Sequence, residues 1–336
     1  MRVSGPAILV AGGAGYIGAH TCLRLAEAGY LPVTLDNLAT GHREAVKWGP
    51  LAVGDIRDVE TVRSLVRRHD VKAAIHFAAY SLVAESVANP VKYFDNNVGA
   101  GSLFLGALVD AGVEAVVFSS TASVYGVPAR SPVVEDDAKA PINPYGASKL
   151  AVEGLLGALA VAGRLRHTSL RYFNAAGAAE SGEIGEAHDP ETHLIPNLLA
   201  AARPGAKPMT LFGSDYPTPD GTAVRDYVHV VDLADVHILA LRRLLEGGDS
   251  QAWNVGSGEG ASNRQVLTAA ERVLGRPIPH TVGPRRAGDP PALVADPSRL
   301  KAALGWAPKL SDLDTIIATA ARWHGVIPSS PTTSHP

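Results

Sequence analysis

A glycine-rich turn between an apolar run and an amphipathic segment constrains the fold of this chain more than any other feature. Residues 8–18 read ILVAGGAGYIG, in which Gly12, Gly15 and Gly18 form the pattern G-x-x-G-x-x-G. Alone, these glycines would fit an ordinary tight turn. A second apolar run follows and ends in Asp36, however, and an acid at this distance can bind the hydroxyls of an adenosine ribose. The pattern therefore predicts a strand–helix–strand unit that holds a dinucleotide pyrophosphate at the helix N-terminus.

The acid also selects between the two common dinucleotides. A carboxylate at Asp36 would repel the 2′-phosphate of NADP, so we expect NAD. Asp55 and Ile56 follow the next apolar run, where they can contact the adenine.

Short apolar runs alternate with amphipathic segments through the first half of the chain, which indicates parallel strands covered on both faces. We therefore predict an α/β fold with a Rossmann-type doubly wound parallel sheet in residues 1–174. Residues 175–326 are richer in Gly and Pro and predict a smaller mixed α/β lobe, and the Pro/Ser/Thr-rich residues 327–336 predict a disordered tail. The predicted strands are 7–11, 32–35, 51–53, 73–77, 115–119 and 168–172, and the predicted helices are 16–28, 59–69, 91–111, a helix from Pro144, 233–245, 263–274 and 313–324.

Composition excludes several classes of function. The formal net charge of −3 gives no reason to expect nucleic acid or an anionic membrane as a partner, and no apolar run reaches the ~18 residues of a membrane span. The single cysteine, Cys22, excludes an intrachain disulfide. No signal-peptide pattern is visible near the N-terminus, so we expect a cytoplasmic protein. The 12 histidines show no metal-ligand spacing with carboxylates, and we predict no metal.

A second group of residues indicates catalysis. The predicted strand 115–119 ends in small hydroxylated residues that include Ser119 and Thr121, and Tyr145 and Lys149 lie at i and i+4 in NPYGASKLAVEGLL. A surface tyrosine–lysine pair is the ordinary alternative. A tyrosine has a pKa of about 10, but Lys149 and the positive nicotinamide ring could lower it towards ~7, where a general base works best. Thr121 would then orient the same substrate oxygen.

The motifs, in this order along the chain, resemble the extended short-chain dehydrogenase/reductase family, and within it the UDP-glucose 4-epimerase subgroup. They are GGAGYIG, LDNL, GDIRD, HFAA, ESVANP, DNNV, SVYG, NPYGASK, RYFN, PTPDGTAVRDYVHV and RRAGDPP, and the resemblance covers about residues 7–325. It implies that UDP-glucose and UDP-galactose are interconverted by transient oxidation at sugar carbon 4. Tightly bound NAD would serve as resident cofactor, and the 4-keto sugar would turn over in the pocket before the hydride returns. It also implies a homodimer formed through the helices 91–111 and 145–161.

The resemblance assigns further residues to each ligand. Implied NAD contacts, besides those above, are Tyr16, Ile17, Asn37, Leu38, Phe77, Ala78, Ala79, Ser81, Asn96, Ser119, Tyr145, Lys149 and Phe173. Implied contacts with the UDP-sugar are Thr121, Tyr145, Asn174, His193, Leu194, Leu211, Phe212, Arg225, Arg286, Asp289 and Leu293.

Two positions favour an epimerase over a related sugar dehydratase. Dehydratases carry acids directly after the catalytic threonine, whereas this chain has Ala122 and Ser123 there. The acidic run Glu135-Asp136-Asp137 reads as a solvated loop.

Four positions depart from the subgroup pattern, and one of them, Leu293, leaves the sugar open. Ala11 replaces a threonine, Ser81 a lysine and His193 an asparagine, while Leu293 stands where some members carry a tyrosine facing sugar carbon 2. A UDP-N-acetylglucosamine, UDP-pentose or UDP-uronate epimerase is therefore the alternative. A non-catalytic NAD or nucleotide-sugar sensor is the alternative of another class.

Overall fold

The computed structural model describes residues 5–286 and 290–328. Its centre is a seven-stranded parallel sheet with the strand order β10-β6-β5-β4-β1-β2-β3. This order reverses beside β1, as in a doubly wound sheet, and the predicted fold class is confirmed. The strands of this sheet are β1 (Ala7–Ala11), β2 (Leu31–Asp36), β3 (Leu51–Val53), β4 (Ala73–His76), β5 (Ala115–Ser119), β6 (Arg166–Tyr172) and β10 (Gln251–Val255).

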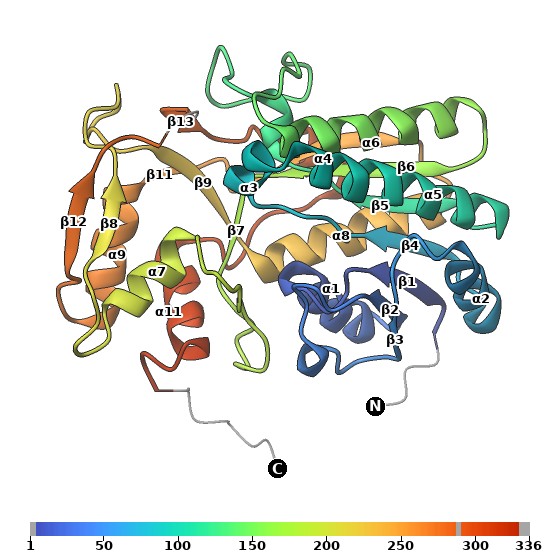
Figure 1. Ribbon diagram of the computed structural model, residues 1–336, viewed down its shortest axis with the longest axis horizontal. Coiled ribbons are helices and arrows are strands. Elements are labelled where there is room, and N and C mark those ends of the chain that lie inside the picture. The colour runs from blue at the N-terminus through green and yellow to red at the C-terminus, as the bar shows by residue number, and fades with distance from the viewer. Residues whose placement is uncertain (1–4, 287–289, 329–336) are drawn as a thin grey trace.

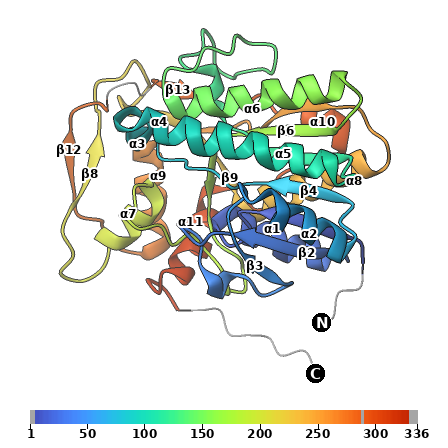
Figure 2. The ribbon, with the colours of Figure 1, turned by 45° about the vertical axis from the view of Figure 1, so that its right-hand side comes forward.

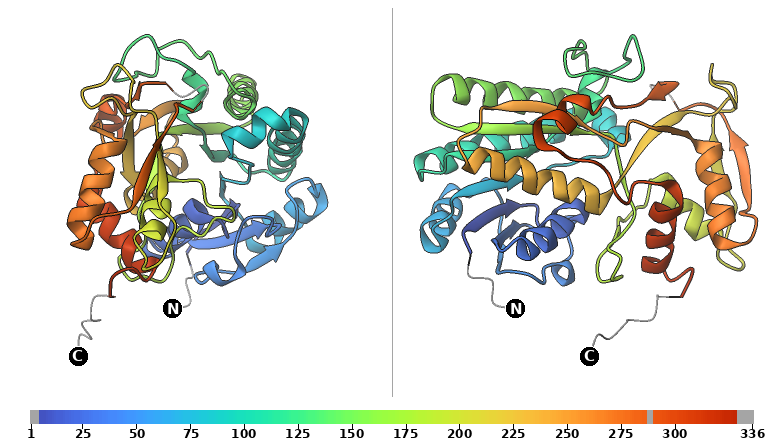
Figure 3. Two further views of the ribbon diagram at one scale, coloured as in Figure 1. Left: turned by 60° about the vertical axis from the view of Figure 1, so that its left-hand side comes forward. Right: turned by 180° about the vertical axis from the view of Figure 1, so that it is seen from behind.

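Helices cover both faces of the sheet because its strands are apolar on both sides (Figure 1). In β1, Leu9 packs with the helices of one face, whereas Ile8 and Val10 pack with those of the other. The first face carries α2 (Val59–His69), α5 (Gly101–Asp110) and α6 (Pro144–Val161), and the second carries α1 (Tyr16–Glu27), α8 (Val230–Leu245) and α10 (Ser298–Leu304). Figure 3 shows α8 crossing the face opposite α5 and α6.

The segment predicted as one helix over 91–111 has three parts. It begins as α4 (Pro90–Tyr93), widens into a π-helical stretch (Phe94–Ala100) and continues as α5, with α3 (Val83–Ala88) just before it. A π-helical stretch shifts the side chains that follow it around the axis and is often found at functional sites. Figure 2 shows α4 and α5 running beside α6.

The smaller lobe is built on strand β9 (Val224–His229). Its helices are α7 (Leu194–Ala201), α9 (Asn263–Leu274) and α11 (Leu313–Trp323), which enclose a core of their own. Strand β9 pairs with β7 (Asn174–Ala176), β11 (Gly260–Ser262) and β13 (Ala292–Leu293), and a second pair joins β8 (Met209–Phe212) to β12 (His280–Gly283).

The chain does not stay in the smaller lobe after residue 174. Helix α8 and strand β10 return to the large sheet, where β10 pairs with β6 as the edge strand. The predicted domain boundary at residue 174 stays a prediction. Helix α8 and strand β10 belong to the large sheet although they come after that residue. Among the described residues, no helix has both the length and the apolar character needed to cross a bilayer.

Candidate active site

The glycine turn that follows β1 has no room for side chains at two of its three glycines. A Cβ on Gly12 would lie 2.7 Å from the Ala78 nitrogen, and Gly12 has a φ of +82°. A Cβ on Gly18 would lie 2.1 Å from the Gly12 oxygen, so α1 packs directly on the turn. Within the described residues, no side chain caps the first turn of α1 and no acid lies in it. These features fit the pyrophosphate of NAD, whose charge the free N–H groups of that turn can bind.

Asp36 lies buried at the end of β2, on the same sheet edge as the glycine turn. Its two oxygens accept hydrogen bonds from the Ala14 nitrogen at 2.9 Å and the Leu38 nitrogen at 2.8 Å. Leu38 has a φ of 58°, a left-handed backbone conformation that is unfavourable for leucine. The Asn37 amide donates to Asp55 at 3.3 Å. The residues predicted to bind the adenosine half of NAD therefore lie together.

The segment after β4 closes the other side of this turn. Phe77 and Ala78 both donate their N–H groups to the Ala11 oxygen, at 2.8 and 3.0 Å. Ser81 is exposed, and Asn96 lies half-buried on the π-helical stretch.

Asn97, the neighbour of Asn96, carries an anchoring role that sequence reasoning missed. Its buried side chain accepts a hydrogen bond from the Tyr80 nitrogen at 2.9 Å and donates to the Ser148 hydroxyl at 3.0 Å. It therefore ties the loop after β4 to helix α6. The only sequence signal for this residue is that it lies in DNNV, one of the motifs shared with the family that the chain resembles.

The hydroxyl groups at the end of β5 meet the first turns of α6. Thr121 accepts a hydrogen bond from the Ser123 nitrogen at 3.1 Å, and its side chain also forms a hydrogen bond with Tyr145. Lys149 donates to the Ser119 oxygen at 2.8 Å, and both Tyr145 and Lys149 are buried. The structure thus brings together the three residues predicted to be catalytic.

Gly146 explains how α6 approaches the end of β5 so closely. A Cβ at this position would lie 2.5 Å from the Ser123 oxygen, well inside contact distance. The glycine of NPYGASK is therefore a packing requirement of the candidate site.

Burial dominates the electrostatics of the tyrosine–lysine pair. It raises the pKa of Tyr145 above its usual range, and the hydrogen bond with Thr121 only partly opposes this effect. Burial also lowers the pKa of Lys149 to about 7, although the charge of Glu153 opposes the shift. The predicted lowering of the Tyr145 pKa requires Lys149 together with the positive nicotinamide ring, whereas within the protein chain alone burial sets the direction of both shifts.

A buried polar network lies behind the candidate site. Glu153 accepts a hydrogen bond from the Ser120 hydroxyl and forms an ion pair with Arg171 at 2.6 Å. Glu135 belongs to the same region, since it is 5% exposed and accepts a hydrogen bond from the Asn254 nitrogen at 2.9 Å. The prediction of a solvated acidic loop is therefore wrong for Glu135. It is buried because strand β10, whose pairing with β6 was not predicted, brings Asn254 to it.

Several residues predicted to bind the UDP-sugar lie where the smaller lobe meets the sheet edge. Arg225 and Leu293 are paired residues of β9 and β13, and Leu293 packs on the same apolar cluster as Phe173. The Arg286 guanidinium lies 4.5 Å above the ring of Phe212. The remaining predicted contacts are Asn174 at the start of β7, Leu194 at the start of α7 and buried Leu211 in β8, whereas Asp289 lies outside the described residues.

His193 is part of a cluster that sequence reasoning did not find. The side chains of Glu186, His188, Glu191 and His193 converge, with one possible ligand atom of each within 4.8 Å of the others. Burial alone would lower the pKa of His193, but hydrogen bonds with Glu186 and Glu191 raise it to about 10. The spacing E-x-H-x-x-E-x-H is visible in the sequence and could have indicated this cluster.

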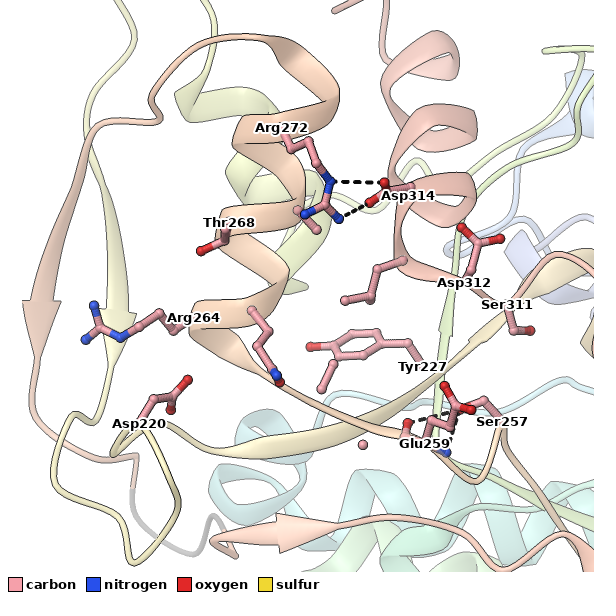
Figure 4. A pocket seen from close by; sticks show the side chains of 15 residues that line it. Asp220, Tyr227, Ser257, Glu259, Arg264, Thr268, Arg272, Ser311, Asp312 and Asp314 are labelled. Atoms are coloured by element: carbon pink, nitrogen blue, oxygen red, sulfur yellow. Dashed lines mark hydrogen bonds and ion pairs between the residues drawn. The ribbon is translucent and has the colours of Figure 1, made fainter.

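A cavity of about 660 Å³ in the smaller lobe contains none of the predicted catalytic residues. It opens between α9 and α11 of the smaller lobe, as Figure 4 shows, and Arg272 and Asp314 form an ion pair across it. A catalytic assignment based on this cavity would therefore miss Tyr145.

Known proteins resemble this chain over nearly its whole length. Residues 8–256 match the NAD dependent epimerase/dehydratase family. A UDP-glucose 4-epimerase from Lacticaseibacillus casei is 50% identical over 320 residues, which cover 94% of this chain and 96% of that protein. The crystal structure of UDP-glucose 4-epimerase from Brucella ovis in complex with NAD superposes with a TM-score of 0.93 at 49% identity, covering 95% of this chain and 98% of that one.

A third relative carries a sugar nucleotide. The UDP-glucose 4-epimerase from Stenotrophomonas maltophila, with bound NAD and formylated UDP-arabinopyranose, superposes with a TM-score of 0.92 at 39% identity and covers 95% of this chain and 98% of that one. The glycine turn, the acid after β2 and these similarities agree, and the chain belongs to the NAD dependent epimerase/dehydratase family, on its UDP-glucose 4-epimerase branch.

Proposed function

We propose that this protein interconverts UDP-glucose and UDP-galactose by oxidising and then re-reducing carbon 4 of the bound sugar. One observation carries the proposal. The buried Tyr145 forms a hydrogen bond with Thr121 and lies one helical turn from the buried Lys149. This pair lies at the sheet edge that also carries the glycine turn. The relatives named above are UDP-glucose 4-epimerases, and two of their structures contain NAD.

The residues of this chain divide the work of the reaction. Bound NAD supplies a hydride acceptor that gives the same hydride back, together with the positive charge of its nicotinamide ring. Tyr145 takes the proton of the sugar 4-hydroxyl and returns it after the sugar has turned. Thr121 orients that hydroxyl, because its own oxygen is fixed by the Ser123 nitrogen. Lys149 contributes its charge from a position fixed by the Ser119 oxygen.

A sugar that must turn in the pocket cannot be held tightly by its own hydroxyls. Affinity therefore has to come from the UDP portion. We propose that Arg225 and Arg286 bind the diphosphate and that Phe212 lies near the uracil. An arginine stacked on the Phe212 ring is compatible with both roles, since its guanidinium edge stays available to phosphate oxygens. Asn174, Leu194 and Leu211 complete the proposed UDP contacts.

The two residues that follow Thr121 do not supply the groups for removal of water. Ala122 and Ser123, which follow Thr121, can neither protonate a leaving hydroxyl nor abstract a proton at neutral pH. The nearby acid Glu135 already accepts a hydrogen bond from the Asn254 nitrogen in a buried network. This chemistry favours epimerisation over dehydration.

The identity of the sugar at carbon 2 depends on Leu293. This side chain packs beside Phe173 and has no hydroxyl, so an N-acetyl group is a specific alternative to the glucose hydroxyl. Parallel assays with UDP-galactose, UDP-N-acetylgalactosamine, UDP-xylose and UDP-glucuronate distinguish the candidates. We expect the highest kcat/KM with UDP-galactose.

We also propose that the protein is a cytoplasmic homodimer. Apolar side chains on the outer surface of α3 to α5 are exposed, with Val87 at 63%, Val91 at 79% and Leu103 at 48%. These helices run beside α6, so a second copy could bury them against its own equivalent face (Figure 2). Light scattering after size exclusion tests the assembly, and cell fractionation tests the location.

The activity is tested on purified protein without added cofactor. We expect bound NAD in the released nucleotide pool and conversion of UDP-galactose to UDP-glucose. Tyr145→Phe should retain NAD and lose turnover by at least about 100-fold, the range over which general acid–base catalysis acts. Tyr30→Phe, outside the site, is the matched control. Unchanged turnover in Tyr145→Phe would refute the assignment of the base.

A further inference from the structure

The segment between β7 and α7 carries four side chains with nitrogen or carboxylate ligand atoms that point towards one another. They are Glu186, His188, Glu191 and His193, spaced E-x-H-x-x-E-x-H, and one ligand atom of each lies within 4.8 Å of the other three. We propose that these four side chains form a binding site for a divalent transition-metal ion of the zinc type.

The ligand atoms are grouped closely enough to approach a single ion. Zinc lies about 2.0–2.2 Å from imidazole nitrogens and carboxylate oxygens, so two ligand atoms are about 3.3 Å apart. Here the Nδ1 atoms of His188 and His193 lie 3.0 and 2.8 Å from Oε1 of Glu186. The Nδ1 atom of His193 lies 2.8 Å from Oε1 of Glu191, and that of His188 lies 4.0 Å from Oε2 of Glu191. The four ligand atoms lie within 4.8 Å of one another, so binding one ion would draw the more distant of them together.

The chemistry of the four groups selects the kind of metal. Two imidazoles and two carboxylates suit zinc and its neighbours in the first transition series, whereas Ca²⁺ and Mg²⁺ prefer oxygen ligands. Two carboxylates would also balance the charge of a divalent ion. Glu186 is the innermost ligand, with only 5% of its surface exposed, while His193 lies at the surface and gives the ion a path of entry.

The surroundings of the cluster make a structural role for the metal reasonable. The Ala187 oxygen, between two ligands, lies 2.8 Å from Nε2 of His42, in the segment after β2. The backbone oxygen of Glu186 accepts a hydrogen bond at 2.8 Å from Nε1 of Trp323, which lies at the end of α11. The segment thus joins the dinucleotide-binding part of the sheet to the smaller lobe. An ion held there would fix that connection without entering the reaction at Tyr145.

The competing explanation is a network of histidines and glutamates held by hydrogen bonds alone. In that network the nitrogens of His188 and His193 share one oxygen of Glu186, and both must carry a proton on Nδ1. Metal binding requires both nitrogens without that proton, so the two explanations differ in what the cluster binds.

The test uses full-length protein with any purification tag removed, treated with EDTA and then dialysed. Titration with ZnCl2 by calorimetry should show about one equivalent of tight binding per chain. Co²⁺ in place of Zn²⁺ should give the visible absorption bands of a tetrahedral nitrogen–oxygen site. Melting with and without Zn²⁺ provides a readout that does not depend on turnover, so failure of the proposed epimerase activity would leave this result unaffected.

Two variants assign the binding to these residues. His188→Ala and Glu191→Gln should each weaken Zn²⁺ binding at least about 100-fold and remove the Co²⁺ bands. His280→Ala, which removes an exposed histidine from β12, should change neither. Glu191→Gln is nearly isosteric, and its circular dichroism shows whether the fold is kept. The proposal fails if wild-type protein binds no Zn²⁺, or if binding survives both cluster substitutions.

Discussion

The buried charge of Lys149 is expected to lower the free energy of unfolding of this protein, although the proposed reaction uses that charge. Its ammonium group is buried, and burial lowers its pKa from an ordinary value of 10.5 to about 7. A tenfold change in a protonation equilibrium is worth about 1.4 kcal/mol. Holding the charged form in the folded protein therefore costs on the order of 4–5 kcal/mol relative to the unfolded chain.

The sign of this effect sets its pH window. Because the folded-state pKa lies below the unfolded value, the unfolded chain binds the proton more tightly between pH 7 and 10.5. The cost is fully present below about pH 7 and disappears as the pH rises towards the ordinary pKa of a lysine, about 10.4.

Lys149→Met removes the charge and keeps most of the volume. The change also leaves the Ser119 oxygen, which now accepts a hydrogen bond at 2.8 Å, without that donor. An unpaired buried carbonyl costs about 1–3 kcal/mol, so we expect a net stabilisation of roughly 2 kcal/mol at neutral pH and a rise in Tm of roughly 3 °C. We expect turnover to fall by at least about 100-fold in the same variant.

Urea unfolding of wild type and Lys149→Met, at several values from about pH 6.5 to about pH 9.5, measures the effect. The advantage of the variant should shrink steadily with rising pH, vanish near about pH 8.5–9 and reverse by about pH 9.5, where the unpaired Ser119 oxygen outweighs the remaining cost of the charge. NAD content is quantified in both proteins, because bound NAD stabilises the folded state. The slope with pH is therefore the decisive quantity. A difference that stays constant with pH, or an equal slope in the exposed-lysine control Lys207→Met, would refute the reasoning.

Three further substitutions test other parts of the structure. Gly146→Ala should lower kcat and stability, because its Cβ would lie 2.5 Å from the Ser123 oxygen; the matched control Gly157→Ala, with open space at its Cβ, should leave turnover unchanged. Leu103→Glu should convert the proposed dimer into monomers in light scattering, and a persistent dimer would move the interface elsewhere. Leu293→Tyr should lower kcat/KM for UDP-N-acetylgalactosamine by at least about 10-fold relative to UDP-galactose, and an unchanged ratio would remove Leu293 from sugar selection.

Local sequence patterns predicted the parts of this fold that depend on near neighbours. The strands β1, β3 and β5 have the predicted bounds, because each is a short apolar run closed by turn residues. The glycine turn and the Tyr145–Lys149 pair were likewise readable, since a turn of backbone and one turn of helix bring their members together.

Features that depend on distant parts of the chain were not predictable in the same way. Strand β10 completes the large sheet although it lies far beyond the predicted boundary at residue 174. Its arrival buries Glu135, so the burial of that acid depends on a pairing that no local pattern shows. The burial that raises the pKa of Tyr145 is likewise a property of the assembled site.

One face of helix α6 accounts for most of the candidate catalytic machinery. Tyr145, Lys149 and Glu153 follow one another at i, i+4 and i+8, and therefore lie along the same side of the helix. The first meets Thr121, the second the Ser119 oxygen and the third the Ser120 hydroxyl, so one helical face contacts three consecutive residues at the end of β5.

Because these residues share one face of α6, the position of the proposed base Tyr145 depends on the same contacts that hold the end of β5. Arg171 on β6 holds Glu153 through an ion pair at 2.6 Å, which fixes the helix against the sheet. A shift of one residue along α6 would rotate all three contacts away together. The spacing Y-x-x-x-K-x-x-x-E is therefore a geometric requirement of this site. The charge of Lys149, which the proposed reaction uses, lies on the same helix as Glu153, whose ion pair with Arg171 positions that helix.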